Sequence, residues 1–296
     1  MVNHDGAEGA AAAYVLSAMQ AQPLLDARRN QLEVAATSLD LGITVVHLRL
    51  TDAGVLLPDG AILIWESVER IMGAQKDALI APCFRLERGE PHRLRTFSET
   101  TQRPLSLMAT RSAPTLLLAG FTMHRIKDTD PKRDTQAKLD SIAPVVGRVL
   151  DTTTGLGYTA SAASSAADEV VTVERDPAVL GLARHNPWSR ELFGKSNIVQ
   201  WVGDASVLIA KCDDRSFTRI IHDPPALSLA GELYAATFYE HLYRVLRPGG
   251  RLFHYAGNPR SALGRRVTRG VRERLADAGF RRLRPRPAAF GIVAYR

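Results

Sequence analysis

The sequence predicts an α/β protein in which a Rossmann-like sheet with helices on both faces follows a smaller helix-plus-β domain. Two observations lead to this fold class. After about residue 145, short apolar segments alternate with helical segments, which is typical of a mainly parallel sheet covered on both faces. Before that point, short apolar runs are separated by turn residues, which favours antiparallel strands. We therefore expect two domains, at residues 1–145 and 146–296.

Length and composition exclude several classes of protein. The 296 residues are 45% hydrophobic and 23% charged, which suits a globular chain that buries a core. We find no apolar run of about 18 residues, the length a membrane-spanning helix needs, and the first residues lack the basic start of a secretory signal. Cys83 and Cys212 are too few for a disulfide framework or a four-thiolate zinc site. We expect a soluble, cytoplasmic protein without a membrane partner.

The N-terminal half shows the period of half-buried strands. Val46, Leu48 and Leu50 alternate with polar neighbours, and turn residues at 52–54 and 58–60 separate this run from the next. We expect this domain to roof the active site. Its expected elements are helices at 9–22, 66–73 and 134–142, strands at 43–50, 61–65 and 115–120, and a polar loop at 123–134.

The C-terminal half repeats a strand, a loop and a helix. Each strand-like run is followed by a helical segment, and a final hairpin at 280–284 and 289–295 is expected to close the sheet. In sheets of this kind, ligands bind where the carboxyl ends of strands meet the following helices. The expected helices cover residues 158–167, 177–185, 205–211, 232–245 and 265–278.

Polar or glycine-bearing loops follow the first two of these strands. The first strand ends at Asp151, and Gly155 and Gly157 follow it, where a missing Cβ lets the backbone approach a ligand. The second ends at Glu174, about 20 residues after the glycine loop, which suits a carboxylate that accepts both hydroxyls of a ribose. A glycine turn can also serve packing alone, and strand ends carry acids because they reach solvent.

The next two strands also end in acids. The third ends at Gly203-Asp204-Ala205, where the carboxylate can accept an adenine amino hydrogen and the backbone N–H of Ala205 can face the base. The fourth ends at His222-Asp223-Pro224-Pro225, and the two prolines hold Asp223 rigidly at the sheet edge. Four such strand ends in succession indicate a ligand-binding site more specifically than any one of them does.

With these motifs, residues 145–296 resemble the class I S-adenosylmethionine-dependent methyltransferases, and the resemblance implies S-adenosyl-L-methionine as cofactor. It also implies that Asp151 and the Gly155–Gly157 turn border the methionine moiety, while Glu174 holds the ribose and Asp204 the adenine. Thr153 stands where the family has glycine. The acid at 174 equally fits NAD, but the later motifs favour a methyltransferase over a dehydrogenase. The expected cofactor-binding residues are Asp151, Thr153, Gly155, Gly157, Tyr158, Glu174, Arg175, Gly203, Asp204, Ala205 and Asp223.

A narrower resemblance rests on longer stretches. The runs LDTTTGLGYTA, NPWSRELF, IIHDPPALSLAGELY and FHYAG, together with MHR at 123–125, are similar to a group of methyltransferases described mostly from archaea, whose substrates are unassigned. This resemblance extends into the N-terminal half. It points to a smaller group of methyltransferases, but it does not identify the substrate.

The expected catalytic residues are Asp223, His222 and Tyr158. An Asp-Pro-Pro-aromatic motif grips the target amine in amino-group methyltransferases, but Ala226 stands here at the aromatic position, which disfavours a planar base as acceptor. Tyr158 could face the sulfonium, and His222 could move a proton, although a buried histidine satisfied by backbone partners is the commoner case. We expect no metal. The loop residues His124, Asp128 and Asp130 are expected to cap the pocket.

Three functions stay open at this point. The first is methyl transfer to a small or medium acceptor, with a small molecule as partner. The second keeps the cofactor but breaks another carbon–sulfur bond, as an azetidine-2-carboxylate synthase or an aminocarboxypropyl transferase does, and releases methylthioadenosine. The third is an RNA-associated methyltransferase that uses its basic C-terminal helix, because the last fifty residues hold thirteen arginines and two acidic residues. This function is not favoured, because the chain prefers arginine to lysine throughout and lacks interleaved aromatic residues. The acceptor and the oligomeric state lie beyond the sequence.

Overall fold

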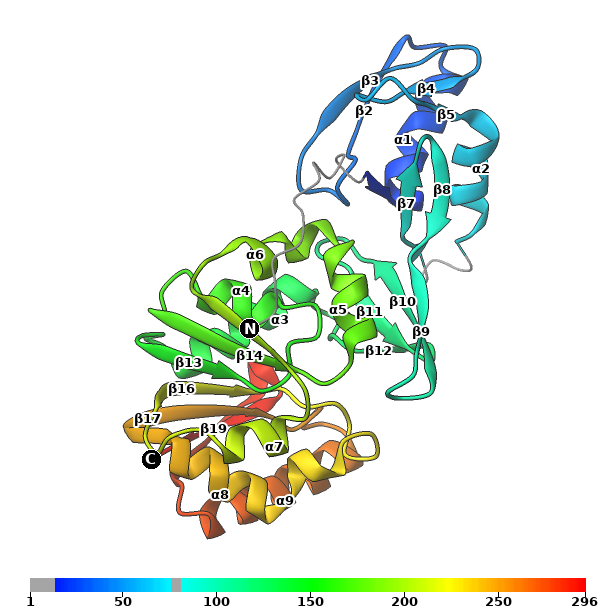
Figure 1. Ribbon diagram of the computed structural model, residues 1–296. Coiled ribbons are helices and arrows are strands. Elements are labelled where there is room, and N and C mark those ends of the chain that lie inside the picture. Colours follow the sequence, from blue (N-terminus) through cyan, green and yellow to red (C-terminus); the bar gives the residue numbers. More distant parts are fainter. Residues whose placement is uncertain (1–13, 76–80) are drawn as a thin grey trace. The chain divides into compact units, whose positions relative to one another are not determined.

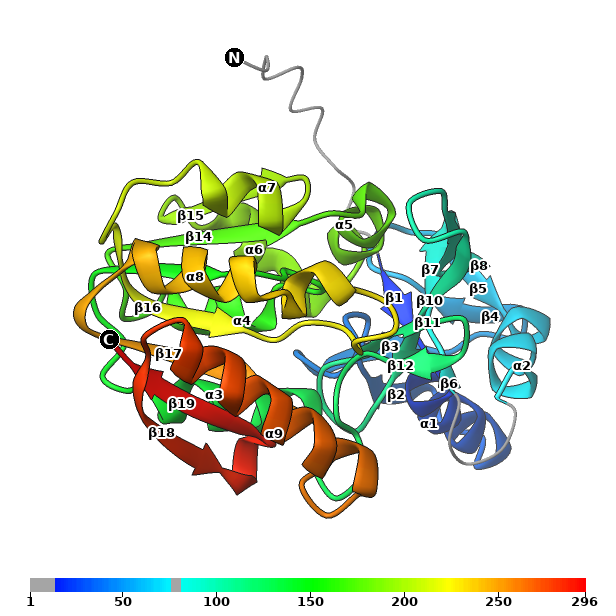
Figure 2. The same cartoon turned by 90° about the horizontal axis from the view of Figure 1, so that it is seen from below.

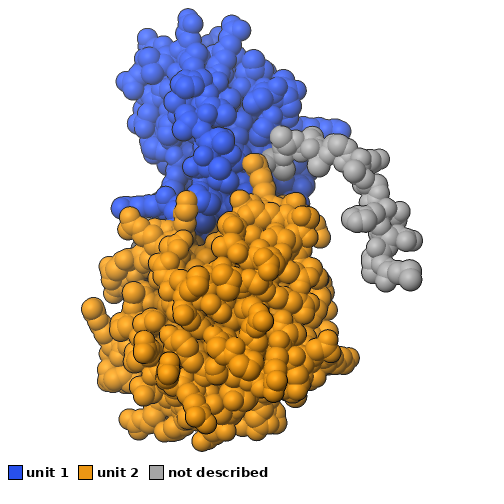
Figure 3. Space-filling model, turned by 90° about the vertical axis from the view of Figure 1, so that its left-hand side faces the viewer, with its two compact units in different colours: residues 1–95, 106–114, 185–188 blue, residues 96–105, 115–184, 189–296 orange. Residues whose placement is uncertain are grey.

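The computed structural model describes residues 14–75 and 81–296 (Figure 1). The chain divides into two compact units, each described here by itself (Figure 3). Of the described residues, 14–75, 81–95, 106–114 and 185–188 form unit 1, and residues 96–105, 115–184 and 189–296 form unit 2. This division differs from the expected boundary at residue 145, because helix α3 (Pro131–Ile142) packs on the sheet of unit 2.

Unit 2 is built on a seven-stranded sheet in the order β15-β14-β13-β16-β17-β19-β18. The five strands β13 to β17 pair in parallel, whereas β19 runs antiparallel to both of its neighbours. The mainly parallel sheet and the closing hairpin are as the sequence predicts. The strands are β13 (Arg148–Asp151), β14 (Glu169–Glu174), β15 (Ile198–Val202), β16 (Phe217–His222), β17 (Leu246–Tyr255), β18 (Arg281–Arg286) and β19 (Gly291–Tyr295).

Helices cover both faces of this sheet (Figures 1 and 2). Side chains of successive strand residues point to opposite faces, so the neighbours Val149 and Leu150 join different apolar clusters. The cluster of Leu150 includes α7, α8 and α9, and that of Val149 includes α3, α4 and α6. The other helices of unit 2 are α4 (Tyr158–Ala163), α5 (Pro177–Arg184), α6 (Arg190–Gly194), α7 (Ala205–Ala210), α8 (Ala236–Val245), α9 (Ala262–Asp277) and three short 3-10 turns, η1 (Pro187–Ser189, reaching into unit 1), η2 (Gly231–Tyr234) and η3 (Pro287–Ala289).

Strand order reverses between β13 and β16. From β13, β14 and β15 extend toward one edge, whereas β16 and β17 extend toward the other. In open α/β sheets such a reversal opens a crevice beyond the carboxyl ends of the strands, where ligands bind. Asp151 ends β13 and Asp223 directly follows β16, so both acids flank this reversal.

The described residues of unit 1 form two helices and several short antiparallel strands. A capping box between Ser17 and Gln20 starts α1 (Ala18–Arg29), and residues 15–16 are extended. Of the expected helix at 9–22, residues 18–22 lie in α1, whereas residues 15–16 form a strand instead. Residues 9–13 lie outside the described residues. The other elements are α2 (Trp65–Gly73), β1 (Val15–Leu16), β2 (Val34–Thr37), β3 (Val46–Arg49), β4 (Gly54–Leu56), β5 (Ile62–Ile64), β6 (Ala81–Pro82), β7 (Phe84–Glu87) and β8 (Glu90–Arg93).

Two further strands carry residues of both units, namely β9 (Arg95–Ser98) and β10 (Arg103–Ala109). In unit 2, β11 (Thr115–Leu118) and β12 (Phe121–Thr122) form a hairpin. Within the described residues, no helix combines the length and the apolar character needed to cross a membrane.

Candidate functional site

The carboxyl ends of β13, β14, β15 and β16 bring four acids to one edge of the sheet. In the parallel register, Asp151 lies beside Thr172, and Glu174 lies beside Val202. Asp204 and Asp223 follow the ends of β15 and β16. The structure thus gathers the predicted site residues at one edge, and the role of each of them stays a prediction.

Asp151 is a buried carboxyl group with spare capacity for hydrogen bonds. Its Oδ2 accepts hydrogen bonds from the hydroxyls of Thr159 (2.9 Å) and Thr172 (3.2 Å). Its Oδ1 is buried without a hydrogen-bond partner among the described residues. Burial raises the pKa of Asp151 to about 7. A cationic group that reaches this oxygen would therefore meet an acceptor that is otherwise unused.

The loop after β13 leaves room above Gly155. Gly155 has φ +54°, and a Cβ there would meet no atom within 4 Å. Its N–H donates to Glu174 Oε2 at 2.8 Å. Thr153 donates its hydroxyl to the backbone carbonyl of Asp223 at 2.8 Å. Thr153 therefore ties the loop after β13 to the loop after β16.

Gly157 is required for packing. Its φ is +76°, and a Cβ would lie 2.5 Å from Cδ2 of Leu192 on α6. Gly157 also precedes the first residue of α4, in a left-handed conformation that glycine adopts without strain. The open space above Gly155 and the filled space beside Gly157 give these two glycines different roles.

We expect Gly157→Ala to lower the free energy of unfolding by about 2–4 kcal/mol, because strain in the left-handed region adds to the contact with Leu192. Gly155→Ala carries only the backbone strain, about 1–2 kcal/mol. Urea unfolding of both variants checks the difference. Equal losses of stability would contradict the assignment of Gly157 to packing.

Glu174 connects the glycine loop to the end of its own strand. Its Oε1 accepts the N–H of Asp176 at 3.0 Å, while Oε2 accepts that of Gly155. Each oxygen of a carboxylate can accept about two hydrogen bonds, so both can still accept a ligand hydroxyl. Burial raises the pKa of Glu174 to about 6. This half-buried group is mainly ionised at neutral pH.

Asp204 is both a helix cap and an open acceptor. Its Oδ1 accepts from the N–H (2.8 Å) and hydroxyl (2.6 Å) of Ser206 at the start of α7. Its Oδ2 lies 3.8 Å from Nη1 of Arg175, whose closer partner is Glu232 at 2.9 Å. Arg175 is therefore engaged with acids on both sides.

The backbone of the loop after β15 is also held in place. The N–H of Gly203 donates to the backbone carbonyl of Glu174 at 2.8 Å, and Ala205 begins α7.

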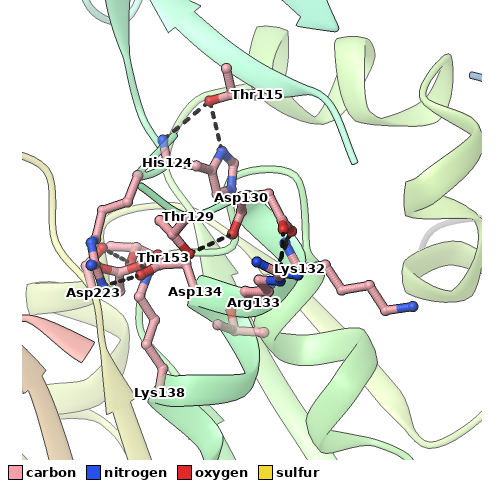
Figure 4. Close-up of polar contacts among 12 residues, drawn as sticks. Thr115, His124, Thr129, Asp130, Lys132, Arg133, Asp134, Lys138, Thr153 and Asp223 are labelled. Carbon is pink, nitrogen blue, oxygen red and sulfur yellow. Dashed lines mark hydrogen bonds and ion pairs between the residues drawn. The ribbon is translucent and has the colours of Figure 1, made fainter. Parts of the chain in front are cut away.

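Asp223 belongs to a chain of alternating charges that sequence reasoning missed (Figure 4). Lys138 Nζ lies 2.5 Å from Asp223 Oδ2 and 2.7 Å from Asp134 Oδ2. Arg125 Nη1 lies 2.8 Å from Asp134 Oδ1 and donates to the carbonyl of Ala288 at 2.7 Å. We name these four side chains, Arg125, Asp134, Lys138 and Asp223, the charge chain.

A sequence signal for the charge chain does exist. Asp134 and Lys138 are one turn apart on the face of α3 that also buries Ile142. Charged residues are rarely buried unless they are paired, so an acid and a lysine on an apolar helix face point to a buried ion pair. Nothing in the sequence says that the lysine also reaches Asp223.

Burial and neighbouring charges shift the pKa values of Asp223 and Lys138 in opposite directions. Burial raises the pKa of Asp223 above its usual range, although the charge of Lys138 opposes that shift. Burial alone would lower the pKa of Lys138, but the charges of Asp223 and Asp134 raise it instead. Lys138 therefore stays protonated at neutral pH.

His222 is a satisfied core histidine. Its Nε2 lies 3.0 Å from the carbonyl of Leu233, which can only accept, so Nε2 carries the hydrogen. Its Nδ1 then accepts the hydroxyl of Thr152 at 2.7 Å. Burial lowers the pKa of His222 well below its usual range. The catalytic role predicted for His222 stays a prediction, and this geometry leaves neither nitrogen free for it.

Tyr158 begins α4 and is 8% exposed. Its ring centroid lies 5.1 Å from that of His124, which forms a 3.0 Å contact with the hydroxyl of Thr115 (Figure 4). Asp130 caps α3 by accepting the N–H groups of Lys132 and Arg133. The expected capping of the pocket by His124, Asp128 and Asp130 stays a prediction. No group of three metal-ligating side chains gathers in residues 14–75 and 81–296.

Comparison with family models finds no match. Among curated proteins, an uncharacterized protein of Methanocaldococcus jannaschii, MJ1233, is 46% identical over 183 residues, which cover 61% of this chain and 63% of that protein. Polyamine aminopropyltransferase 2 of Streptomyces coelicolor is 33% identical over 91 residues, which cover 29% of this chain and 16% of that protein. The chain thus spans less than two thirds of the length of either relative.

Solved structures share the fold at low sequence identity. Spermidine synthase in complex with the transition-state analogue AdoDATO matches with a TM-score of 0.57 and 15% identity, over 73% of this chain and 75% of that chain. Spermidine synthase from Thermotoga maritima gives 0.54 and 14%, with the same shares of both chains. MnmC2 from Aquifex aeolicus gives 0.50 and 17%, over 67% of this chain and 72% of that one. The chain therefore has a mixed α/β fold with a central sheet, similar to that of the spermidine synthases and of MnmC2.

Proposed function

We propose that this chain transfers a carbon group from an S-adenosylmethionine-type sulfonium to an amine that Asp223 holds. The observation that carries the proposal is the position of Asp223: a partly exposed carboxylate beside the strand-order reversal, at the same edge as Asp151, Glu174 and Asp204. Three acids along that edge suit a nucleoside sulfonium, and the fourth suits the group that attacks it.

The residues at this edge fit such a cofactor. Glu174 has free acceptor positions for the two ribose hydroxyls, and Asp204 Oδ2 can accept an adenine amino hydrogen. The Oδ1 of Asp151, which is buried without a hydrogen-bond partner among the described residues, is the acceptor that the ammonium group of the methionine moiety would use. When bound, the sulfonium supplies an electrophilic carbon and a neutral thioether leaving group.

The group that we favour is the three-carbon arm. The fold likeness to spermidine synthases and the local identity with an aminopropyltransferase both support this choice. The amine lone pair forms a bond to the arm's terminal carbon, the carbon–sulfur bond breaks with its electron pair going to sulfur, and methylthioadenosine leaves. Asp223 accepts the proton that the amine loses and passes it to solvent. If the arm's own amine attacks, the product is azetidine-2-carboxylate.

Methyl transfer is the second candidate. Asp223-Pro224-Pro225 resembles the amine-gripping motif of amino-group methyltransferases, and the same site could direct an amine to the methyl carbon. The leaving group would then be S-adenosylhomocysteine. The two candidates therefore differ in a sulfur product that can be identified directly.

Analysis of the sulfur product distinguishes transfer of the three-carbon arm from methyl transfer. We would incubate the protein with S-adenosylmethionine alone, with S-adenosylmethionine plus a panel of diamines, and with decarboxylated S-adenosylmethionine plus the same diamines. Mass spectrometry should detect methylthioadenosine in at least one arm, above the level given by the Asp223→Asn variant. S-adenosylhomocysteine without methylthioadenosine would support methyl transfer and overturn the favoured reading.

A nucleic-acid partner stays a separate prediction. The five arginines of α9 are all exposed, and three of the four in β18 are exposed beside them. If this surface binds RNA phosphates, log affinity should fall linearly with log salt, with a slope of about −0.7 per phosphate contact for a single strand. Replacement of two α9 arginines by glutamate should reduce the magnitude of that slope, because fewer phosphate contacts remain. Absence of RNA binding in filter assays at low salt would contradict the prediction.

A further inference from the structure

We propose that Lys138 is a positioning residue for Asp223, and this inference rests on the proposed function of that carboxylate. Lys138 holds Oδ2 by an ion pair, favours the ionised form of the carboxyl group, and orients it toward the acceptor amine. The inference assigns a role to a residue of α3, outside the four strand ends that form the rest of the site (Figure 4).

The side chains of Lys138 and Asp223 differ in their exposure to solvent. The side chain of Lys138 is 4% exposed, whereas that of Asp223 is 23% exposed. Within the described residues, Lys138 is the one hydrogen-bond donor to the Asp223 carboxylate. The lysine therefore fixes the carboxylate from the protein side, while the exposed part of the carboxylate is left for a small molecule.

Loss of Lys138 would affect Asp223 more than Asp134. Asp134 already has a second cationic partner, because Arg125 Nη1 lies 2.8 Å from its Oδ1. Without Lys138, Asp134 would keep that partner, but Asp223 would lose the one ion pair it forms among the described residues. An unpaired, partly buried carboxylate takes up a proton more readily, and a protonated Asp223 could not accept a proton from an amine.

Other groups facing Asp223 do not replace Lys138. Asp134 raises its pKa further, and Arg125 lowers it only as a minor contributor. The charge of Asp223 in turn raises the pKa of the surrounding acidic groups, Asp151 from β13, Tyr234 from η2 and Tyr255 from β17. Lys138 is the nearest cation, and it also lies 5.4 Å from the centroid of the Tyr255 ring.

The first test is the pKa of Asp223 itself, which needs no turnover. We would follow the carboxyl carbon of Asp223 by ¹³C NMR in the full chain, using Asp223→Asn to assign its signal. In Lys138→Met, the pKa of Asp223 should rise by at least about one unit. Lys195→Met is the matched control, because Lys195 forms a similar one-turn ion pair with Glu191 on α6. An unchanged pKa of Asp223 in a folded Lys138→Met protein would overturn the inference.

The second test uses the pH dependence of transfer. The acid limb of the kcat profile should move to higher pH in Lys138→Met by the same shift that the NMR titration shows. A shift of one unit lowers activity on that limb by about tenfold, and activity recovers at higher pH. Lys138→Arg should restore part of the loss, and it serves as the test protein if the methionine variant does not fold. The double variant Lys138→Met/Asp223→Asn should be no slower than Asp223→Asn alone.

These outcomes separate the inference from the proposed function. A pH-independent loss, or a double variant much slower than Asp223→Asn, would mean that Lys138 acts through packing and not through Asp223. If no sulfonium substrate reacts at all, the proposed function fails. In that case the NMR titration still decides whether Lys138 sets the ionisation of Asp223.

Discussion

Replacing Asp223 by asparagine should reduce the transfer rate by about 10²–10⁴-fold, the usual contribution of a general base. Asn has nearly the same shape, and its amide oxygen can still accept from Lys138, so the fold should survive. It cannot take a proton from the acceptor amine. Sulfonium affinity should stay within about twofold, since Glu174 and Asp204 are unchanged. Single-turnover kinetics and isothermal titration calorimetry measure the two quantities separately.

A matched control for this substitution is Asp168→Asn. Asp168 is exposed and lies just before β14, at the other end of the strands from the site. Its replacement should leave both rate and affinity unchanged. A normal transfer rate in Asp223→Asn would remove the base from the proposed mechanism and leave only its binding role.

The second large effect concerns Glu174. Glu174→Gln should weaken binding of S-adenosylmethionine by about 10–100-fold, because the ribose hydroxyls would lose hydrogen bonds to an ionised acceptor, worth about 1.5–3 kcal/mol. The binding step needs an ionised carboxylate, and burial raises the pKa of Glu174 to about 6. Wild-type affinity should therefore decline as the pH falls through about 6, and the glutamine variant should lose this component of the pH dependence.

Glu169→Gln is the control for Glu174. Glu169 begins the same strand, β14, and pairs with Arg148 at the opposite end of the sheet. Calorimetry of both variants should show a loss of affinity only for Glu174→Gln. Equal affinities for wild type and Glu174→Gln would exclude the ribose-holding role and leave Glu174 as a brace for Gly155.

The strand ends could be predicted because they depend on local sequence and on one rule of topology. Parallel strands deliver their carboxyl ends to one edge, so apolar runs that end at Asp151, Glu174, Asp204 and Asp223 specify four neighbouring side chains before any contact is known. The hairpin of β18 and β19 follows equally from local pattern. The start of helix α1 could not be placed in this way, because the choice between strand and helix at Val15 depends on pairing with Arg85, seventy residues later.

The role of each glycine and histidine needed the packed structure. Gly155 and Gly157 look alike in the sequence, yet only the second faces the Leu192 side chain. His222 looks like a proton carrier beside an acid, yet its hydrogen bonds to Thr152 and Leu233 occupy both nitrogens. Such assignments depend on neighbours that are distant in the sequence, and no local pattern encodes them.

The sequence by itself determined the mainly parallel sheet, the edge at which its strands end and the acids that line this edge, because alternation of apolar runs and turn residues acts locally along the chain. Only the tertiary structure decided how those acids are charged and held. The pKa of Asp223 depends on Lys138, which lies 85 residues away in sequence and 2.5 Å away in space. Electrostatic energy depends on distance through space and on burial, and both are set only when α3 packs onto the sheet.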